Sequence, residues 1–247
     1  MNRVKSGVTG LDELIGGGYP TGRSTLVTGA CGTGKTIFCV QYIYMGASKY
    51  NEPGVYVTLD ERPALVREDV MQFGWDLKKY EDKDLIHIID GSVARIGMPS
   101  EEEYTLPMTG FDLDKLLLEI MRVTKRIGAK RVVIDSIPAL GFNFADENEI
   151  RKAILKLSYM LMRIGVTSLM TSEIAEGGNK FGKYEVEEYV VDGVVVLHYS
   201  GVGGGGTNRT LHIRKMRATK HSENLHPITI TNKGVTVHKL EDVYEEG

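Results

Sequence analysis

The stretch Gly29-Ala-Cys-Gly-Thr-Gly-Lys-Thr36 decides the fold of this chain. It fits the pattern G-x-x-x-x-G-K-[ST], whose glycines let the backbone curl so that successive N–H groups point at phosphate oxygens. The apolar run before it, residues 24–28, is typical of a strand, and residues 37–45 after it are typical of a helix. Strand, loop and helix in this order predict a phosphate-binding loop rather than an accidental glycine-rich turn.

The loop implies a place for a metal ion. Lys35 is expected to reach the β and γ phosphates of a nucleotide, and the Thr36 hydroxyl to occupy one position on Mg²⁺. Asp135 ends another apolar strand, residues 131–134, which places its carboxylate at the carboxyl edge of a sheet beside the loop. We therefore expect Asp135 to hold Mg²⁺ through water. The alternative is an ordinary boundary between a strand and a loop.

Strand and helix patterns alternate along the chain. We expect strands at residues 24–28, 55–59, 85–89, 131–134 and 167–170, and a strand-rich end at residues 193–198, 210–215, 228–231 and 235–238. Asp112 is a suitable N-cap for a helix, and a second helix is expected over residues 150–164. Asn232-Lys233-Gly234 suits a hairpin turn. The pattern predicts an α/β fold of one domain, residues 1–247, with a mostly parallel sheet, helices on its faces and a C-terminal antiparallel extension.

Composition and charge limit the possible partners and cellular location of the chain. The chain has 247 residues, is 42% hydrophobic and carries a formal net charge of -3, so no global charge favours a polyanionic partner. Cys31 and Cys39 match no metal or redox spacing and are expected to be reduced thiols. No apolar run approaches a membrane span, and the N-terminal residues lack the apolar core of an export signal. We expect a cytoplasmic protein without a membrane partner.

Two further groups of residues carry chemistry. Asp60 and Glu61 end the strand at residues 55–59, where adjacent carboxylates can activate a water near a γ phosphate. The alternatives are a solvated loop, or pairing of Glu61 with Arg62 or Arg67. Lys215 and Arg217 point the same way from a strand, and taken alone they favour an exposed sheet face.

With these residues assembled, the chain resembles the RecA-like ATPases, and specifically the KaiC family. The resemblance rests on SGVTGLDELIGGGYPTGRSTLVTG at residues 6–29, EPGVYVTLDERP at 52–63, FGWDL at 73–77, GFDLDKL at 110–116, AKRVVIDS at 129–136, TSE at 171–173, YEVEEYVVD at 184–192, IRKMRATKH at 213–221 and PITITNKGV at 227–235. It implies a RecA-like fold, ATP or ADP with Mg²⁺ as cofactors, and a ring, usually a hexamer, with nucleotide between neighbouring subunits.

The resemblance also assigns roles to residues. Asp135 matches the family's second nucleotide motif, and Asp60 and Glu61 match its acidic pair, with Asp60 at the general base. The phosphate loop is matched by Gly32, Thr33, Gly34, Lys35, Thr36 and Ile37. A strand that reaches the neighbour's phosphates and ribose is matched by Lys215, Met216, Arg217, Thr219 and His221, and the lining of the base by Gln72, Thr231 and Asn232.

The chain departs from the family at three places. Asp60 is one methylene shorter than the usual glutamate, so hydrolysis is expected to be slow or to use Glu61. Asn232 stands where the family often has aspartate, which leaves the base preference open. Glu187-Glu188 stands where the autophosphorylating module has a Ser-Thr acceptor pair, so we expect no autokinase activity.

These features favour a Mg²⁺-dependent ATPase ring that changes conformation for an unknown protein partner. The first alternative is a DNA-binding recombinase paralogue or helicase-like ring, and the second is a nucleotide switch that does not hydrolyse ATP. Of the two loops expected to face a central pore, residues 200–208 are uncharged and residues 174–188 have a charge of about -2, so we expect no strong DNA binding. The run Gly203–Gly206 suits a mobile hairpin tip or a flap for a partner.

Overall fold

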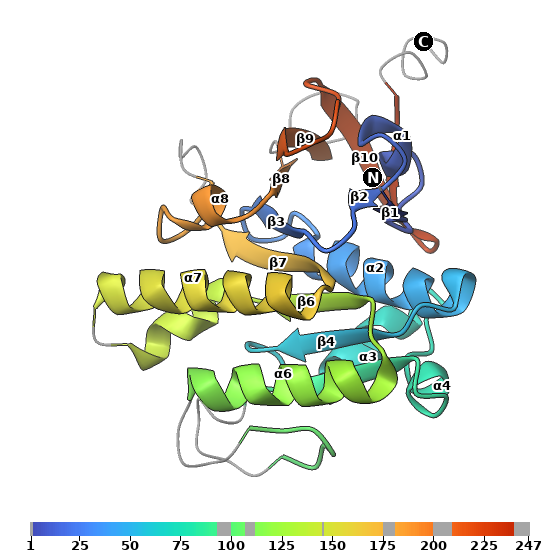
Figure 1. Cartoon of the computed structure of the whole chain (residues 1–247). Coiled ribbons are helices and arrows are strands. Elements are labelled where there is room, and N and C mark those ends of the chain that lie inside the picture. Colours follow the sequence, from blue (N-terminus) through green and yellow to red (C-terminus); the bar gives the residue numbers. More distant parts are fainter. Residues whose placement is uncertain are drawn as a thin grey trace.

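A nine-stranded sheet runs through the computed structural model, which describes residues 2–92, 100–106, 112–144, 146–174, 181–199 and 209–239. Six strands are parallel: β3 (Ser24–Gly29), β4 (Gly54–Thr58), β5 (Ile86–Asp90), β6 (Arg131–Asp135), β7 (Thr167–Glu173) and β8 (Gly193–Tyr199). The antiparallel strands β9 (Arg209–Met216), β10 (Leu225–Thr231) and β11 (Gly234–Val237) extend it beyond β8. The order is β11-β10-β9-β8-β3-β7-β6-β4-β5 (Figure 1).

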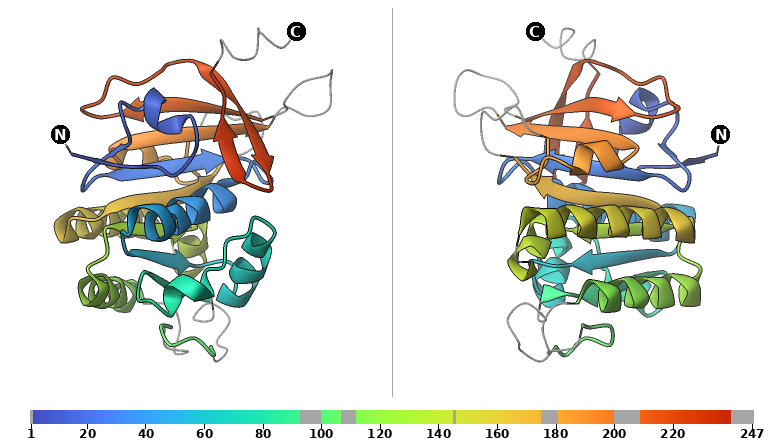
Figure 2. Two further views of the ribbon diagram at one scale, coloured as in Figure 1. Left: turned by 90° about the vertical axis from the view of Figure 1, so that its right-hand side faces the viewer. Right: turned by 60° about the vertical axis from the view of Figure 1, so that its left-hand side comes forward.

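Helices cover both faces of the sheet. On one face lie α2 (Lys35–Tyr50), α3 (Pro63–Met71) and α4 (Lys78–Glu81), and on the other α6 (Leu113–Ile127) and α7 (Glu147–Ile164), as the two views of Figure 2 show. Successive strand residues point to opposite faces, so neighbours such as Val132 and Val133 enter different apolar clusters. The predicted fold, a mostly parallel sheet with helices on both faces and an antiparallel extension, is confirmed. The expectation of one domain over residues 1–247 stays a prediction.

Two predictions of local structure are confirmed, a helix cap and a hairpin turn. The Asp112 side chain caps α6 by accepting hydrogen bonds from the backbone N–H groups of Asp114 and Lys115. Thr231 pairs with Gly234 across a two-residue loop, which confirms the hairpin between β10 and β11. A Cβ atom on Gly234 would lie 2.5 Å from the Trp75 ring, so only glycine fits at this close approach.

The short elements have weaker signals and were not predicted. They are β1 (Arg3–Val4), α1 (Leu11–Leu14), β2 (Tyr19–Pro20), α3, α4, the 3₁₀ segment η1 (Ile137–Asn143) and α8 (Glu187–Val190). β1 and β2 form a separate antiparallel pair. Among the described residues, no helix is both long and apolar enough to cross a membrane.

The strand directions define two sides of the sheet, which we call the phosphate edge and the opposite edge. The phosphate edge is the side at which the parallel strands end, with Gly29, Thr58, Asp135 and Glu173 as the last residues of β3, β4, β6 and β7. The opposite edge is the one where the parallel strands begin. Because β9 runs antiparallel to β8, Met216 at its end pairs with Gly193 at the start of β8. The strand that carries Lys215 therefore ends at the opposite edge.

Candidate active site

A cavity of about 910 Å³ opens at the phosphate edge. It is bounded by the phosphate loop, the segments after β4 and β6, the end of α3 and the hairpin turn between β10 and β11. Most of the predicted site residues line it: Gly32, Gly34, Lys35, Thr36, Ile37, Asp60, Glu61, Gln72, Asp135, Thr231 and Asn232. Eleven positions spread over 200 residues of sequence therefore meet in one hollow.

The phosphate loop takes its shape from its glycines and from Thr33. Gly34, the N-cap of α2, has a φ of 100°, a conformation that other residues rarely adopt. Thr33 is buried, and its hydroxyl donates to the Ala30 carbonyl oxygen at 2.9 Å, so its side chain supports the loop and does not line the cavity. Lys35 Nζ donates to the carbonyl oxygens of Gly29 and Ala30 at 2.9 and 3.0 Å, which leaves one N–H for another acceptor.

The geometry around Asp135 suits a Mg²⁺ site. The Tyr56 hydroxyl donates to one carboxylate oxygen at 2.6 Å, and the Thr171 hydroxyl donates to the other at 2.5 Å. These bonds fix the orientation of the carboxylate while each oxygen keeps a lone pair for water. Thr36 lines the same cavity, and hydroxyl and carboxylate oxygens are the ligands that Mg²⁺ prefers. Thr36 and Asp135 are therefore the residues that would hold the ion.

The two members of the acidic pair differ in their surroundings. The Ser136 hydroxyl donates a short hydrogen bond to Asp60 Oδ2, so Asp60 is oriented from the end of the neighbouring strand β6. Glu61 is an exposed residue, but partial burial of its carboxyl raises the pKa of that group, with further increases from the nearby carboxylates of Asp135, Asp69 and Asp60. A raised pKa and crowding by like charges are common where carboxylates serve chemistry rather than packing.

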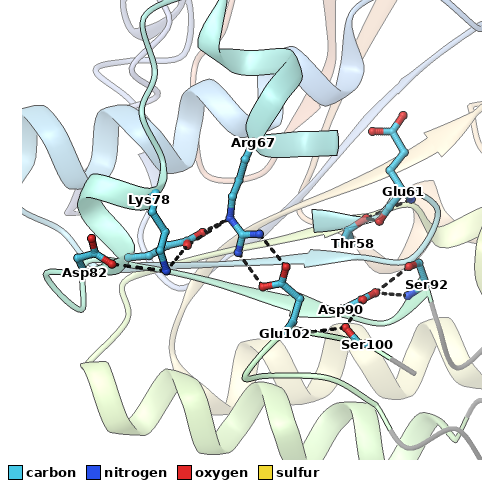
Figure 3. A network of polar contacts seen from close by, with 10 residues as sticks. Thr58, Glu61, Arg67, Lys78, Asp82, Asp90, Ser92, Ser100 and Glu102 are labelled. Atoms are coloured by element: carbon cyan, nitrogen blue, oxygen red, sulfur yellow. Dashed lines mark hydrogen bonds and ion pairs between the residues drawn. The ribbon is translucent and has the colours of Figure 1, made fainter. Parts of the chain in front are cut away.

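Arg67 is not the partner of Glu61. Its Nε donates to Glu81 at 2.9 Å, and its two terminal nitrogens donate to the two oxygens of Glu102 at 2.7 and 2.8 Å. All of its directional bonds therefore join α3 to α4 and to the segment after β5. Figure 3 shows the Glu61 carboxylate directed away from this network. The alternative in which Arg67 neutralises Glu61 is thus wrong.

Several cavity residues were missed by sequence reasoning. They are Cys31, Thr58, Phe73, Ser136, Pro138, Ala139, Glu173, Lys183, Arg209 and Ile230. Arg209 shows why. It begins β9, so the antiparallel pairing brings it to the phosphate edge, where its guanidinium lies over the Tyr199 ring and donates to the Gly32 carbonyl oxygen at 3.2 Å. The sequence alone shows only a basic residue six positions before Lys215. Its position at the cavity cannot be predicted without the pairing register of β8 and β9.

Besides Thr33, five predicted residues lie outside the cavity of their own chain: Lys215, Met216, Arg217, Thr219 and His221. Lys215 Nζ donates to the carbonyl oxygens of Glu188 and Val191. The Met216 side chain is buried in the core. The other three lie beyond the end of β9, with Arg217 Nη1 3.8 Å from Asp192 Oδ1. Within one chain, these residues do not meet the phosphate loop.

The loops expected to face a pore are described only in part. Residues 175–180 and 200–208, with Glu176, Lys180 and Gly203–Gly206, lie outside the described residues. Two of the charges counted for the first loop are not at a pore surface in this chain. Glu187 is fully buried, and Lys183 lines the cavity.

The chain is similar to several known proteins. The family model described as "ATPase: KaiC" matches residues 4–242. The chain is 38% identical to UPF0273 protein MJ1359 of Methanocaldococcus jannaschii over 238 residues, which cover 96% of this chain and 97% of that protein. It is 42% identical to the crystal structure of the KaiC-like protein PH0186 from Pyrococcus horikoshii, with a TM-score of 0.83 over 96% of this chain and 99% of that one.

A longer relative is also similar. The circadian clock oscillator protein KaiC of Parathermosynechococcus lividus is 37% identical over 238 residues. The match covers 96% of this chain but 42% of that protein. The chain therefore spans about two fifths of the clock protein and nearly all of its single-module relatives.

Proposed function

The chain belongs to the KaiC family of ATPases, and from that premise we propose that it hydrolyses ATP with Mg²⁺ in a head-to-tail ring, a hexamer of identical subunits. Each nucleotide would lie in the cavity at the phosphate edge of one subunit, and the opposite edge of the next subunit would complete the site. Such an arrangement joins two different surfaces, and it closes into a ring when the rotation between subunits permits.

Within one subunit, the described residues supply most of the chemistry. Lys35 binds the β and γ phosphates. Thr36 and, through water, Asp135 would hold Mg²⁺, which when bound would supply charge neutralisation at those phosphates. Asp60, oriented by Ser136, accepts the proton of the attacking water. Catalysis of this kind is mostly positioning and charge stabilisation, so the short reach of Asp60 is consistent with slow turnover.

One observation carries the shared site. Lys215 and Arg217 have the charge that a γ phosphate needs, yet both lie outside the cavity of their own chain and at the other end of the sheet. A second copy, placed with its opposite edge against the phosphate edge of the first, would supply these cations. A cation supplied by a neighbour can contribute about 10³-fold or more in rate.

The biological role follows the same premise. One relative is named a circadian clock oscillator protein, and we infer that this chain uses its nucleotide cycle for regulation or signalling through a protein partner in the cytoplasm. A switch that binds ATP without hydrolysing it is the alternative that Asp60 motivates, and measured turnover distinguishes the two.

Mixed rings test the proposal. Arg217→Ala subunits keep an intact phosphate loop, and Lys35→Ala subunits keep an intact opposite edge. When Arg217→Ala subunits are assembled with an excess of Lys35→Ala subunits, turnover should exceed the sum of the two pure variants and should vanish on dilution below the assembly concentration. Strictly additive activity in rings shown to be mixed would mean that each site is completed within one subunit.

A further inference from the structure

Glu187 is a fully buried carboxylate on α8, and its surroundings fix its position. The Ser172 hydroxyl donates to it at 3.0 Å, and the backbone N–H groups of Tyr184 and Val186 donate to it at 3.2 Å. No cation among the described residues pairs with it. Burying a carboxylate is costly unless hydrogen bonds satisfy it, so these three donors make Glu187 an anchor between the end of β7 and α8.

Backbone carbonyl groups in α8 and just after it hold Lys215. The ammonium group donates to the carbonyl oxygens of Glu188 at 2.8 Å and Val191 at 2.7 Å. One of its three N–H groups remains, and no carboxylate in the described part of the chain forms an ion pair with it. Burial lowers the pKa of Lys215, and the nearby Arg217 lowers it further. A half-buried cation with only neutral acceptors is suited to receive an anion.

We propose that Glu187 is a positioning residue, which holds α8 and through it Lys215 in place for the phosphates bound by the next subunit. This inference rests on the shared site of the proposed function. The same anchor also contacts the wall of its own cavity, since the Ser172 hydroxyl accepts from the backbone N–H of Lys183 at 3.2 Å. An effect on the neighbour's site must therefore be separated from an effect on the subunit's own site.

Mixed rings make that separation. Donor subunits carry Lys35→Ala and offer only their opposite edge, while acceptor subunits carry Arg217→Ala and offer only their phosphate loop. In the mixture, turnover arises at acceptor loops that face donor edges. Adding Glu187→Gln to the donors should lower turnover about tenfold or more, since small displacements of a catalytic cation are costly. The same change on the acceptors should leave turnover within about twofold.

Three variants sharpen the test. In donors that already carry Lys215→Ala, Glu187→Gln should cause no further loss, because there is no ammonium left to position. Glu188→Gln is the matched control, since Glu188 holds Lys215 through its backbone carbonyl and should keep turnover within about twofold. Ser172→Ala removes one donor to Glu187 without removing the buried charge, and it should show the same donor-specific loss if Glu187→Gln subunits fail to assemble.

The outcomes are distinct. A loss confined to Glu187→Gln on acceptors, a loss of equal size with Glu188→Gln, or no loss in either arm would overturn the positioning role. If the parent mixture of donors and acceptors shows no gain over the separate variants, the shared site itself is wrong and the positioning role falls with it.

Discussion

The two edges of the sheet differ in what they can do alone. The phosphate edge gathers a lysine, a hydroxyl and four carboxylates around one cavity, namely Lys35, Thr36, Asp60, Glu61, Asp135 and Glu173. The opposite edge carries Lys215 and Arg217 but lines no part of that cavity. In the proposed function, the first edge binds a nucleotide within one chain, whereas the second would act only when another copy faces it. One half of the proposed machinery is therefore local to a chain, and the other half would depend on assembly.

The largest expected effect is the loss of nucleotide binding when the phosphate edge is altered. Lys35→Ala should abolish both nucleotide binding and Mg²⁺-dependent turnover at every protein concentration, because the loop loses the charge that meets the β and γ phosphates. Titration with a fluorescent ATP analogue and a phosphate-release assay measure the two. Lys49→Ala, in the last turn of the same helix, is the control and should match the wild type. Binding and turnover both near wild type in Lys35→Ala would remove the phosphate edge from the mechanism.

Arg217→Ala should leave nucleotide binding within a few fold and lower turnover by about 10³-fold. The residue lies outside the cavity of its own chain, so binding by the loop is preserved while charge stabilisation in the transition state is lost. Steady-state kinetics at a concentration that maintains rings measures this. If binding fell as much as turnover, the opposite edge would act in ground-state binding and the contrast between the edges would weaken.

The residues predicted at the phosphate edge lie together around the cavity for a physical reason. Phosphate binding needs consecutive backbone N–H groups, so Gly32, Gly34 and Lys35 are neighbours in sequence and form a motif. Asp135 followed because a parallel strand that ends in a carboxylate can only present it at that edge. Both rules operate over a few residues and do not depend on the rest of the fold.

The same reasoning failed where contacts depend on register. Arg209 reaches the cavity because β9 is antiparallel to β8, and Glu187 is buried because Ser172 and two backbone amides receive it. Charged residues are usually exposed, so the sequence alone favoured a solvated Glu187. Without the resemblance, Lys215 and Arg217 are interpreted as part of an exposed sheet face, since no local pattern records which residues would face a second copy.

Asp60→Asn should lower turnover by about 10²-fold or more and leave ATP affinity within a few fold, as expected when a proton acceptor is lost. Glu61→Gln is the matched comparison, since it makes the same change one residue along. Single-turnover measurements isolate the chemical step. If only Glu61→Gln shows the loss, Glu61 is the base. If neither variant slows hydrolysis, the acidic pair is structural and the phosphate edge acts through binding alone.

The smallest expected effect is a change in Tm when one carboxylate at each edge is replaced by its amide. Burial, followed by the charges of Asp135, Asp69 and Asp60, raises the pKa of Glu61 in the folded protein. When folding raises the pKa of a carboxyl, the protonated group contributes its full stabilisation at a pH below its pKa in the unfolded chain, about 4.3. This contribution is lost as the pH rises through the pKa of the group in the folded protein. Glu61→Gln cannot lose a proton, so its Tm at pH 7 should exceed that of the wild type, and the difference should shrink as the pH falls toward about 4.

Asp192 at the opposite edge should behave in the reverse way. Its carboxylate accepts a hydrogen bond from Arg23 at 2.5 Å, so Asp192→Asn removes an ion pair rather than a repulsion and should lower the Tm at pH 7 by about 1–3 °C. Scanning calorimetry of both variants, without nucleotide, measures the pair of signs. A lower Tm for Glu61→Gln would mean that Glu61 makes a stabilising contact. In that case the crowded carboxylates at the phosphate edge do not destabilise the fold, and the two edges differ only in what they bind.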